Sequence, residues 1–185
     1  AEECVAFIRD REASAAVLEQ AKARGELPLR PIHGDPKINN MLLDNGSGEA
    51  IALIDLDTVK PGLVHYDIGD CLRSCCNRLG EETTAFDAVQ FDLELAGAIL
   101  EGYLAVAGRF LTDTERRYIP EAARLISFEL GLRFFSDYLA GNTYFKADHP
   151  HHNLHRAVVQ FRLSASIEAQ QGQLCSLVEQ LAEAS

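Results

Sequence analysis

Three polar residues in the first third of the chain, Asp35, Asn40 and Asp55, have types and spacings that could support chemistry. Asp35 follows one short apolar run, Asn40 stands five residues later at the head of a second, and Asp55 lies in a third, 20 residues after Asp35. If the second and third runs form a hairpin, the far strand returns beside the loop that opened it, and the three side chains meet. A carboxylate that accepts a hydroxyl proton, with an amide and a carboxylate that hold Mg²⁺, is the set that phosphoryl transfer from ATP requires.

The elements that must position these residues follow from apolar runs and turn chemistry. Residues 29–32, 41–43 and 51–56 are apolar and are separated by turn residues, which predicts three short strands. The Gly46-Ser47-Gly48 run between the last two lacks the third glycine and the lysine of a phosphate-binding loop. We therefore predict that it is the turn of a hairpin.

The rest of the chain has helical patterns. Helices are predicted over residues 1–24, 67–78, 86–104, 112–139 and 154–181. Gly25 is placed to end the first helix, and Thr112 to Glu115 is a capping-box pattern at the start of the fourth. The expected fold class is α+β: a mostly helical body with a small β-hairpin that carries the candidate catalytic loop.

Composition narrows the class of protein. The 185 residues suit one domain, and the excess of 28 acidic over 17 basic residues gives a net charge of −11. Such a surface repels phosphate backbones and anionic lipid, so neither nucleic acid nor membrane is an expected partner. The five cysteines form no C-x-x-C pair, which predicts reduced thiols and a cytoplasmic location. Because the chain begins at Ala1 and its only methionine is Met41, we expect a piece of a longer product whose signal peptide, if any, lies upstream.

The string at residues 33–44 reads H-G-D-P-K-I-N-N-M-L-L-D, with I-D-L-D at 54–57 and Y-D-I-G-D-C-L-R at 66–73. H-G-D-x-x-x-x-N followed by I-D resembles the aminoglycoside and choline phosphotransferases, relatives of protein kinases, whose loop reads H-R-D-x-x-x-x-N. With G-L-R-F at 131–134 and Y-F-K at 144–146, the string looks most similar to the N-acetylhexosamine 1-kinase branch. The resemblance implies the C-terminal lobe of a protein-kinase-like phosphotransferase.

The resemblance also implies roles for the matched residues. Asp35 would be the catalytic base, and Lys37 would neutralise charge on the phosphoryl group that is transferred from ATP. Asn40 and Asp55 would ligate Mg²⁺. Asp57 would be a further metal carboxylate, although a solvated residue at a strand end is an equal alternative.

Four other matched residues would support the loop or the substrate. His33 and Asp67 would hold the catalytic loop in place, with a plain helix cap as the alternative for Asp67. Arg133 and Tyr144 would line the sugar site, because a guanidinium fork and a phenol suit polyol recognition. Packing or structural ion pairing is the alternative for both. No tryptophan is present to stack on a sugar.

The nucleotide lobe that precedes this lobe in kinases, with its phosphate loop and strand lysine, has no counterpart in the sequence. We therefore expect one C-terminal lobe over 1–185, made of an N-terminal helix (1–25), catalytic and metal-binding loops (27–66) and a helical substrate-binding part (67–185). Alone it would transfer phosphate poorly or not at all. Its partners would be the missing lobe, a nucleotide and a small sugar-like molecule.

Other functions stay open. A kinase for an amino alcohol or aminoglycoside would need an acidic or aromatic pocket for a cationic substrate. A non-catalytic module would keep affinity for Mg²⁺ or sugar without transfer. A zinc site among His149, His151, His152 and His155 is disfavoured, because no Cys or Glu stands beside them at ligand spacing. The thiols Cys71, Cys75 and Cys76 are better explained as small buried side chains.

Overall fold

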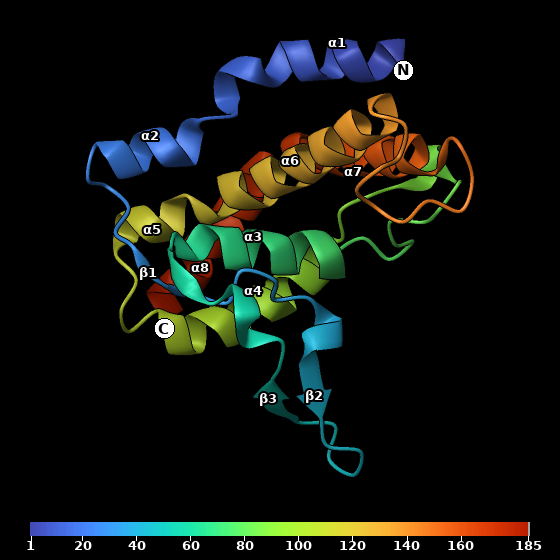
Figure 1. Cartoon of the computed structure of the whole chain (residues 1–185). Coiled ribbons are helices and arrows are strands. Elements are labelled where there is room, and N and C mark those ends of the chain that lie inside the picture. Colours follow the sequence, from blue (N-terminus) through green and yellow to red (C-terminus); the bar gives the residue numbers. More distant parts are fainter. Residues whose placement is uncertain (185) are drawn as a thin grey trace.

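The fold is a computed structural model that describes residues 1–184, apart from the side chains of Ile38 and Ala184 (Figure 1). The α-helices are α1 (Glu2–Arg11), α2 (Val17–Ala23), α3 (Val64–Cys75), α4 (Leu93–Ala107), α5 (Asp113–Arg117), α6 (Ile119–Leu139), α7 (His152–Ala169) and α8 (Gln171–Ala184). The strands are β1 (Arg30–Ile32), β2 (Met41–Leu43), β3 (Ala50–Leu53) and β4 (Lys60–Gly62). The 3-10 turns are η1 (Glu12–Ser14), η2 (Ile38–Asn40), η3 (Leu56–Thr58) and η4 (Phe86–Ala88). The predicted α+β class, mostly helical, is confirmed.

Helix α6 runs through the middle of the body, with α3 packed on one side and α7 on another (Figure 1). Its buried residues join two apolar clusters, one built mainly with α3, α4 and α8 and the other with α1, α2 and α7. Gly69 lets α3 approach α6 closely, because a Cβ at this position would lie 2.9 Å from the Ala122 carbonyl oxygen. Within the described residues, no helix is long and apolar enough to cross a membrane.

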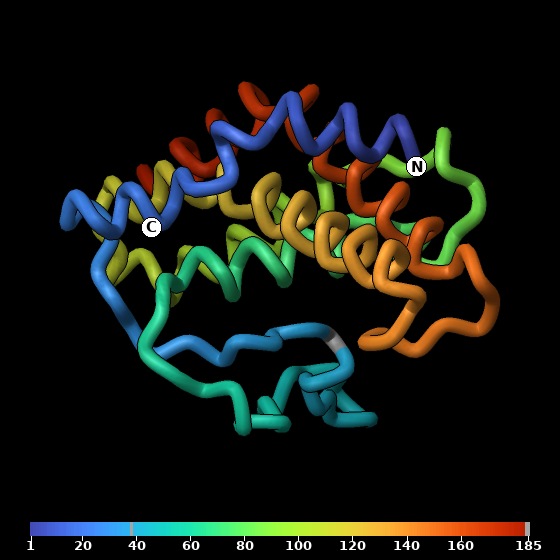
Figure 2. Tube along the Cα trace, turned by 45° about the horizontal axis from the view of Figure 1, so that its top comes forward, coloured from blue at the N-terminus to red at the C-terminus, as the bar shows by residue number. Residues whose placement is uncertain are grey.

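The predicted hairpin is present. Strands β2 and β3 pair antiparallel with Met41 opposite Leu53, and the hairpin projects away from the helices (Figures 1 and 2). The Asp44 carboxylate accepts hydrogen bonds from the backbone N–H groups of Gly46 and Ser47, at 3.0 and 2.8 Å, which closes the turn. The glycine-rich run is therefore a hairpin turn, as predicted.

The hairpin exposes apolar side chains to an unusual degree. Met41, Leu42, Leu43, Ile51 and Leu53 are each between 37% and 65% exposed. Contiguous exposed apolar surface on a soluble protein commonly marks a contact region.

One strand was not predicted. The sequence after Asp57 was expected to be a Pro-Gly loop, but Lys60–Gly62 forms β4 and pairs antiparallel with β1. Pro61 lies opposite Pro31 in this two-stranded ribbon, where the missing N–H of each proline is tolerated at a free edge. The ribbon fixes where the chain leaves the loops between β1 and β4 and enters α3.

The single helix expected over residues 1–25 is wrong: it is two helices, α1 and α2, joined by η1. The Ser14 hydroxyl donates to the Arg11 carbonyl oxygen at 2.9 Å, and the Arg11 guanidinium donates to Glu168 of α7 at 2.7 and 2.8 Å. The local bond from Ser14 competes with the helical ladder, and the distant pair with Glu168 ties the end of α1 to α7. Gly25, with a φ of 76°, follows the end of α2.

Helix α3 begins at Val64, so the boundary predicted at residue 67 is three residues late. Leu63 is extended, and the chain passes from β4 into the helix with no side-chain cap, which leaves Asp67 inside the first turn. The helix predicted from residue 86 begins only at Leu93, where the Asp92 carboxylate accepts a hydrogen bond from the Leu95 N–H at 2.8 Å.

The last two predicted helices are each divided. The helix over 112–139 is broken at Tyr118 into α5 and α6, and Pro120 lies in the first turn of α6, where its missing N–H costs no helical bond. The capping box at Thr112 and Glu115 is present. The helix over 154–181 is broken at Gln170 into α7 and α8.

Glu115 ties β1 to α5 and is expected to matter for stability. Its side chain is fully buried and accepts hydrogen bonds from Arg30 at 2.7 and 2.9 Å. Although burial raises the pKa of Glu115, the bonds from Arg30 and Thr112 hold it below its usual value. Glu115→Ala should therefore lower the free energy of unfolding by about 3 kcal/mol at pH 7. Urea denaturation followed by circular dichroism measures this loss.

The pH dependence has a definite sign. A carboxyl whose pKa is depressed by folding stabilises above its unfolded pKa, and this contribution is lost as the pH falls through the folded pKa. The deficit of Glu115→Ala should therefore shrink below about pH 4. Asp113→Ala, at a side chain 84% exposed on the same helix, serves as the control. Equal stability of the two variants at pH 7 would contradict the prediction.

Candidate functional site

The loop after β1 and the loop after β3 are held together by hydrogen bonds from the backbone and from two side chains. The Ile54 N–H donates to the Asn40 carbonyl oxygen at 2.9 Å, and the Thr58 hydroxyl donates to the His33 carbonyl oxygen at 2.6 Å. His33 Nε2 lies 3.0 Å from the Ile54 carbonyl oxygen, while its Nδ1 accepts from the Asp35 N–H at 3.3 Å. Because Nδ1 accepts, Nε2 is the donor nitrogen of this buried imidazole. His33 thus bridges the two loops.

Asp67, in the first turn of α3, anchors the first loop to the helical body. One carboxylate oxygen accepts from the His33 N–H at 2.7 Å and the other from the Gly34 N–H at 2.9 Å. Hydrogen bonds from backbone N–H groups to a carboxylate are about twice as strong as neutral ones. Through Asp67, helix α3 therefore holds the backbone of His33 and Gly34, and so sets the position of Asp35, the next residue along the chain.

Asp35 lies at the centre of a small polar cluster. Lys37 Nζ is 2.6 Å from Asp35 Oδ2, and Asn40 Nδ2 donates to the Asp35 carbonyl oxygen at 2.8 Å and to Oδ2 at 3.3 Å. The hydrogen bond to Asp35 raises the pKa of Lys37, and the charges of Asp35, Asp55 and Asp70 add to this effect. The structure therefore brings Lys37 and Asn40 directly to Asp35, with Asp55 near enough to act on Lys37.

The predicted metal residues are only partly assembled. Asn40 uses its amide nitrogen on Asp35, so its Oδ1 is left without a protein partner among the described residues. Asp55 is exposed and has a left-handed backbone with a φ of 63°. Asp57 is exposed in η3 and, within the described residues, no hydrogen bond or ion pair joins it to the cluster. Oxygen donors of this kind suit Mg²⁺, which takes one or two carboxylates and completes its shell with water and phosphate.

A cavity of about 400 Å³ opens beside Asp35, between the loop after β1 and α6. Figure 2 shows this loop (light blue) and the turn after α6 (orange) on the same side of the molecule. The cavity is lined by Gly34, Asp35, Lys37, Tyr66, Asp70, Arg73, Glu81, Ile126, Glu129, Leu130, Arg133, Phe134, Phe145 and Arg156. Four of these residues are acidic and four basic, so their formal charges balance.

The two predicted sugar-site residues differ in their placement. Arg133 lines the cavity, and its guanidinium carbon lies 5.2 Å from the centre of the Phe145 ring. Tyr144 is 76% exposed and is not part of the lining. The aromatic residues that line the cavity are Tyr66, Phe134 and Phe145.

Asp137 holds the turn that carries Phe145. Its carboxylate accepts hydrogen bonds from the backbone N–H groups of Thr143, Tyr144 and Phe145 at 2.8 to 3.0 Å, and from Asn153 at 2.9 Å. Burial opposes ionisation, but these bonds keep the pKa of Asp137 below its usual value. Neither Asp137 nor Phe145 was among the predicted site residues, although Phe145 lies in the Y-F-K string at 144–146.

Two other places carry side chains of types that could do chemistry. Within the described residues, no group of three or more His, Cys, Asp or Glu side chains could hold a metal ion, and this includes the His149–His155 cluster.

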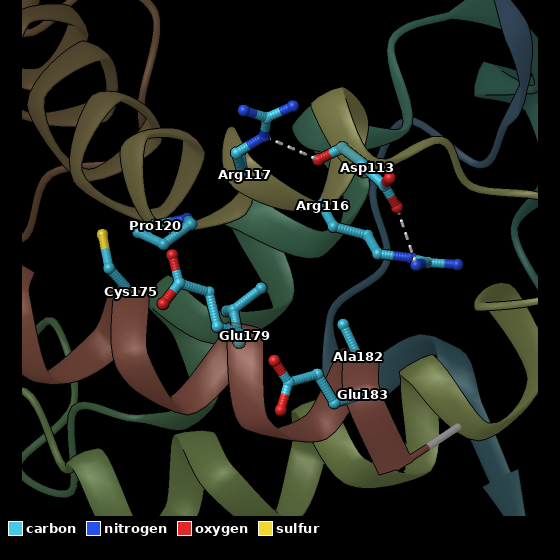
Figure 3. Close-up of a pocket in the computed structure, with 9 residues that line it drawn as sticks. Asp113, Arg116, Arg117, Pro120, Cys175, Glu179, Ala182 and Glu183 are labelled. Atoms are coloured by element: carbon cyan, nitrogen blue, oxygen red, sulfur yellow. Dashed lines mark hydrogen bonds and ion pairs between the residues drawn. The ribbon is translucent and has the colours of Figure 1, made fainter.

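Figure 3 shows a second cavity, of about 220 Å³, between α5 and α8. Its cations are already paired, because Arg116 and Arg117 donate to the side chain and backbone of Asp113. The cavity beside Asp35 is therefore the better candidate.

Gly34 is required where the two loops meet. Its φ is 86°, and a Cβ there would lie 2.9 Å from the Thr58 carbonyl oxygen. We expect Gly34→Ala to lower the free energy of unfolding by about 2 kcal/mol, because a side chain in left-handed backbone costs roughly this much. Chemical denaturation measures the change.

Gly102→Ala is the matched control for this prediction. Gly102 lies in α4, and a Cβ added there would have no neighbouring atom within 4 Å, so the substitution should stabilise the helix by up to about 1 kcal/mol. If the two alanine variants unfolded at the same denaturant concentration, the requirement for glycine at position 34 would be refuted.

A sequence model of the phosphotransferase enzyme family matches residues 2–118. The match covers more than half of the 185 residues and includes Asp35, Asn40, Asp55 and Asp67, while the α6 wall of the cavity lies beyond it. The family and the geometry of the loops agree, and we conclude that this chain belongs to the phosphotransferase enzyme family.

Proposed function

We propose that the chain is the acceptor-binding lobe of an ATP- and Mg²⁺-dependent kinase that phosphorylates a hydroxyl group of a small neutral polyol. A hexose or N-acetylhexosamine, phosphorylated at its anomeric oxygen, is the leading acceptor. One observation carries the proposal: Asp35, paired with Lys37 and Asn40, forms the wall of a cavity whose four acids and four bases balance. Such a cavity suits a neutral acceptor with many hydroxyls.

In this mechanism the acceptor hydroxyl points at the Asp35 carboxylate. Its oxygen forms the new bond to the γ-phosphorus while the bond from that phosphorus to the bridging oxygen of ADP breaks, and the hydroxyl proton passes to Asp35. Lys37 orients Asp35 in the free protein, and its ammonium is placed to stabilise the phosphoryl oxygens. His33 and Asp67 keep the loop in the position that this alignment needs.

The oxygens of Asn40 and Asp55, with Asp57 as an outer carboxylate, are the groups that would hold Mg²⁺. When bound, the ion would neutralise charge on the phosphates of ATP. The Asn40 amide nitrogen is fixed on Asp35, which leaves its oxygen for a ligand. We propose that a nucleotide-binding lobe of the same protein covers the exposed apolar hairpin and completes the ATP site.

A kinase for an amino alcohol or aminoglycoside is the principal alternative. A polycationic acceptor would favour an acidic excess in the cavity, whereas Arg73, Arg133 and Arg156 line it together with Lys37. We propose a cytoplasmic location from the cysteines, and the N-acetylhexosamine branch from the sequence resemblance.

The proposal is tested by ³¹P NMR with Mg-ATP and a panel of N-acetylhexosamines, hexoses, choline and an aminoglycoside. This chain and a version extended upstream in its reading frame are assayed side by side. A sugar 1-phosphate signal from the extended version alone would identify this chain as the acceptor lobe. Silence from both versions across the panel would leave a non-catalytic binding module as the better description.

A further inference from the structure

Helix α6 presents two unpaired charges to the cavity, Glu129 and Arg133, one helical turn apart. The other charged lining residues are bound within the protein: Asp35 to Lys37, Arg73 to Asp70 and Glu81, and Arg156 to Glu82. Within the described part of the chain, neither Glu129 nor Arg133 has a hydrogen bond or an ion pair. The Arg133 guanidinium carbon lies 5.9 Å from the centre of the Tyr144 ring and 5.2 Å from that of Phe145.

The surroundings of Glu129 make its lack of a partner informative. The residue is half-buried, and Tyr66, Ile126 and Leu130 line the cavity around it. Burial raises the pKa of Glu129, and the nearby Glu19 adds to the effect while Arg133 opposes it. Among the described residues, no protein group donates a hydrogen bond to this carboxylate, and its oxygens are not sealed from solvent, so water solvates them in the free protein. A ligand that enters the cavity can replace that water and donate to the carboxylate.

The position of Glu129 defines which part of a ligand it would meet. Asp35 and Lys37 belong to the catalytic loop, whereas Glu129 and Arg133 belong to α6 across the same cavity. A molecule whose reacting hydroxyl lies at Asp35 therefore directs its other groups toward α6. A carboxylate only accepts hydrogen bonds and a guanidinium only donates them. The α6 wall thus fits an acceptor with a hydroxyl near Glu129 and a carbonyl or ring oxygen near Arg133.

We propose that Glu129 is a specificity-determining residue that accepts hydrogen bonds from acceptor hydroxyls other than the one that reacts. The inference rests on the proposed function, because it takes the cavity beside Asp35 as the acceptor site. A site built to bind a hydroxyl discriminates strongly against an analogue that lacks it, since its own polar group is then left unpaired. Glu129 would therefore select among sugars that differ at a single hydroxyl.

The test measures binding, so it does not need phosphoryl transfer. Dissociation constants are obtained by ¹⁵N-HSQC titration of this chain with N-acetylglucosamine, N-acetylgalactosamine, glucose and galactose, with their monodeoxy analogues, and with choline. Glu129→Gln, which keeps the shape but loses the charge, should weaken binding of the preferred sugar about 30-fold. The deoxy analogue that lacks the hydroxyl bound by Glu129 should bind the unaltered chain weakly, and Glu129→Gln should not weaken the binding of this analogue any further. Glu101→Gln, on the exposed face of α4, should bind like the unaltered chain.

Each outcome decides the matter. Unchanged binding by Glu129→Gln, equal losses for every deoxy analogue, absence of sugar binding by the unaltered chain, or tighter binding of choline than of any sugar would overturn the assignment. If Glu129→Gln does not fold by circular dichroism, Glu129→Asp retains the carboxylate and should shift the preference among the deoxy analogues. If transfer fails in the ³¹P assay while Glu129-dependent sugar binding persists, the kinase proposal fails and the role of Glu129 stands.

Discussion

Asp35→Asn is expected to reduce kcat for transfer to the acceptor hydroxyl about a thousandfold, the largest effect of any single substitution in this chain. The amide cannot accept the hydroxyl proton, because it has no basic oxygen at neutral pH. It would also place a donor against Lys37 Nζ, which now lies 2.6 Å from the Asp35 carboxylate. The rate is measured with Mg-ATP and the preferred sugar in the upstream-extended protein.

The same variant separates loss of chemistry from loss of binding. Asp35 is one of many lining residues, so the KM for the acceptor should change by no more than about threefold while kcat falls. Asp10→Asn, at an exposed position on α1, should retain full activity. A kcat for Asp35→Asn within tenfold of the unaltered protein would remove Asp35 from the role of catalytic base.

Asp67→Ala is expected to lower kcat about a hundredfold, because loss of alignment by about 1 Å has an effect of this size. The substitution leaves the His33 and Gly34 N–H groups without their acceptor, so the free energy of unfolding should also fall, by about 2 kcal/mol. Steady-state kinetics and urea denaturation of the same preparation measure the two losses.

The kinetic pattern distinguishes a positioning role for Asp67 from a purely structural one. The cavity wall that binds the acceptor comes largely from α6, so the KM for the acceptor should stay within about threefold. Asp67→Asn keeps one acceptor oxygen and should recover part of kcat. Asp87→Ala, at a side chain 96% exposed, is the control. A rise in KM with unchanged kcat would contradict the positioning role.

The parts of the fold that the sequence predicted well are those that local chemistry decides. The Asp44 turn, the presence of the hairpin and the capping box at Thr112 each depend on residues that are close together in the sequence. The breaks at Ser14 and Gln170 were missed because distant contacts fix them. Arg11 binds Glu168 of α7, and the Gln170 amide donates to the Phe91 carbonyl oxygen at 3.0 Å.

The candidate site likewise contains residues that the sequence could predict and residues that only the folded structure brings to the cavity. Asp35, Asn40 and Asp55 were predicted from the spacing of a hairpin, and the structure joins Asn40 to Asp35 while Asp55 stays exposed. Asp67 was predicted through the family resemblance. Glu129 could not be found, because a glutamate in a helix is ordinarily solvated, and only the folded chain shows that it lines a cavity together with Asp35. Phe145 was passed over for Tyr144, since adjacent aromatic residues in a turn do not reveal which one points inward.

The exposed apolar face of the β2–β3 hairpin has a consequence for how this chain behaves in concentrated solution. Its net charge of −11 makes the molecules repel one another, while the hairpin offers a short attractive patch. Salt shortens the range of the repulsion, from about 10 Å at 0.1 M to about 3 Å at 1 M, and leaves the apolar attraction intact. Added salt should thus drive molecules of this lobe together through the hairpin, whereas dilute buffer keeps them apart.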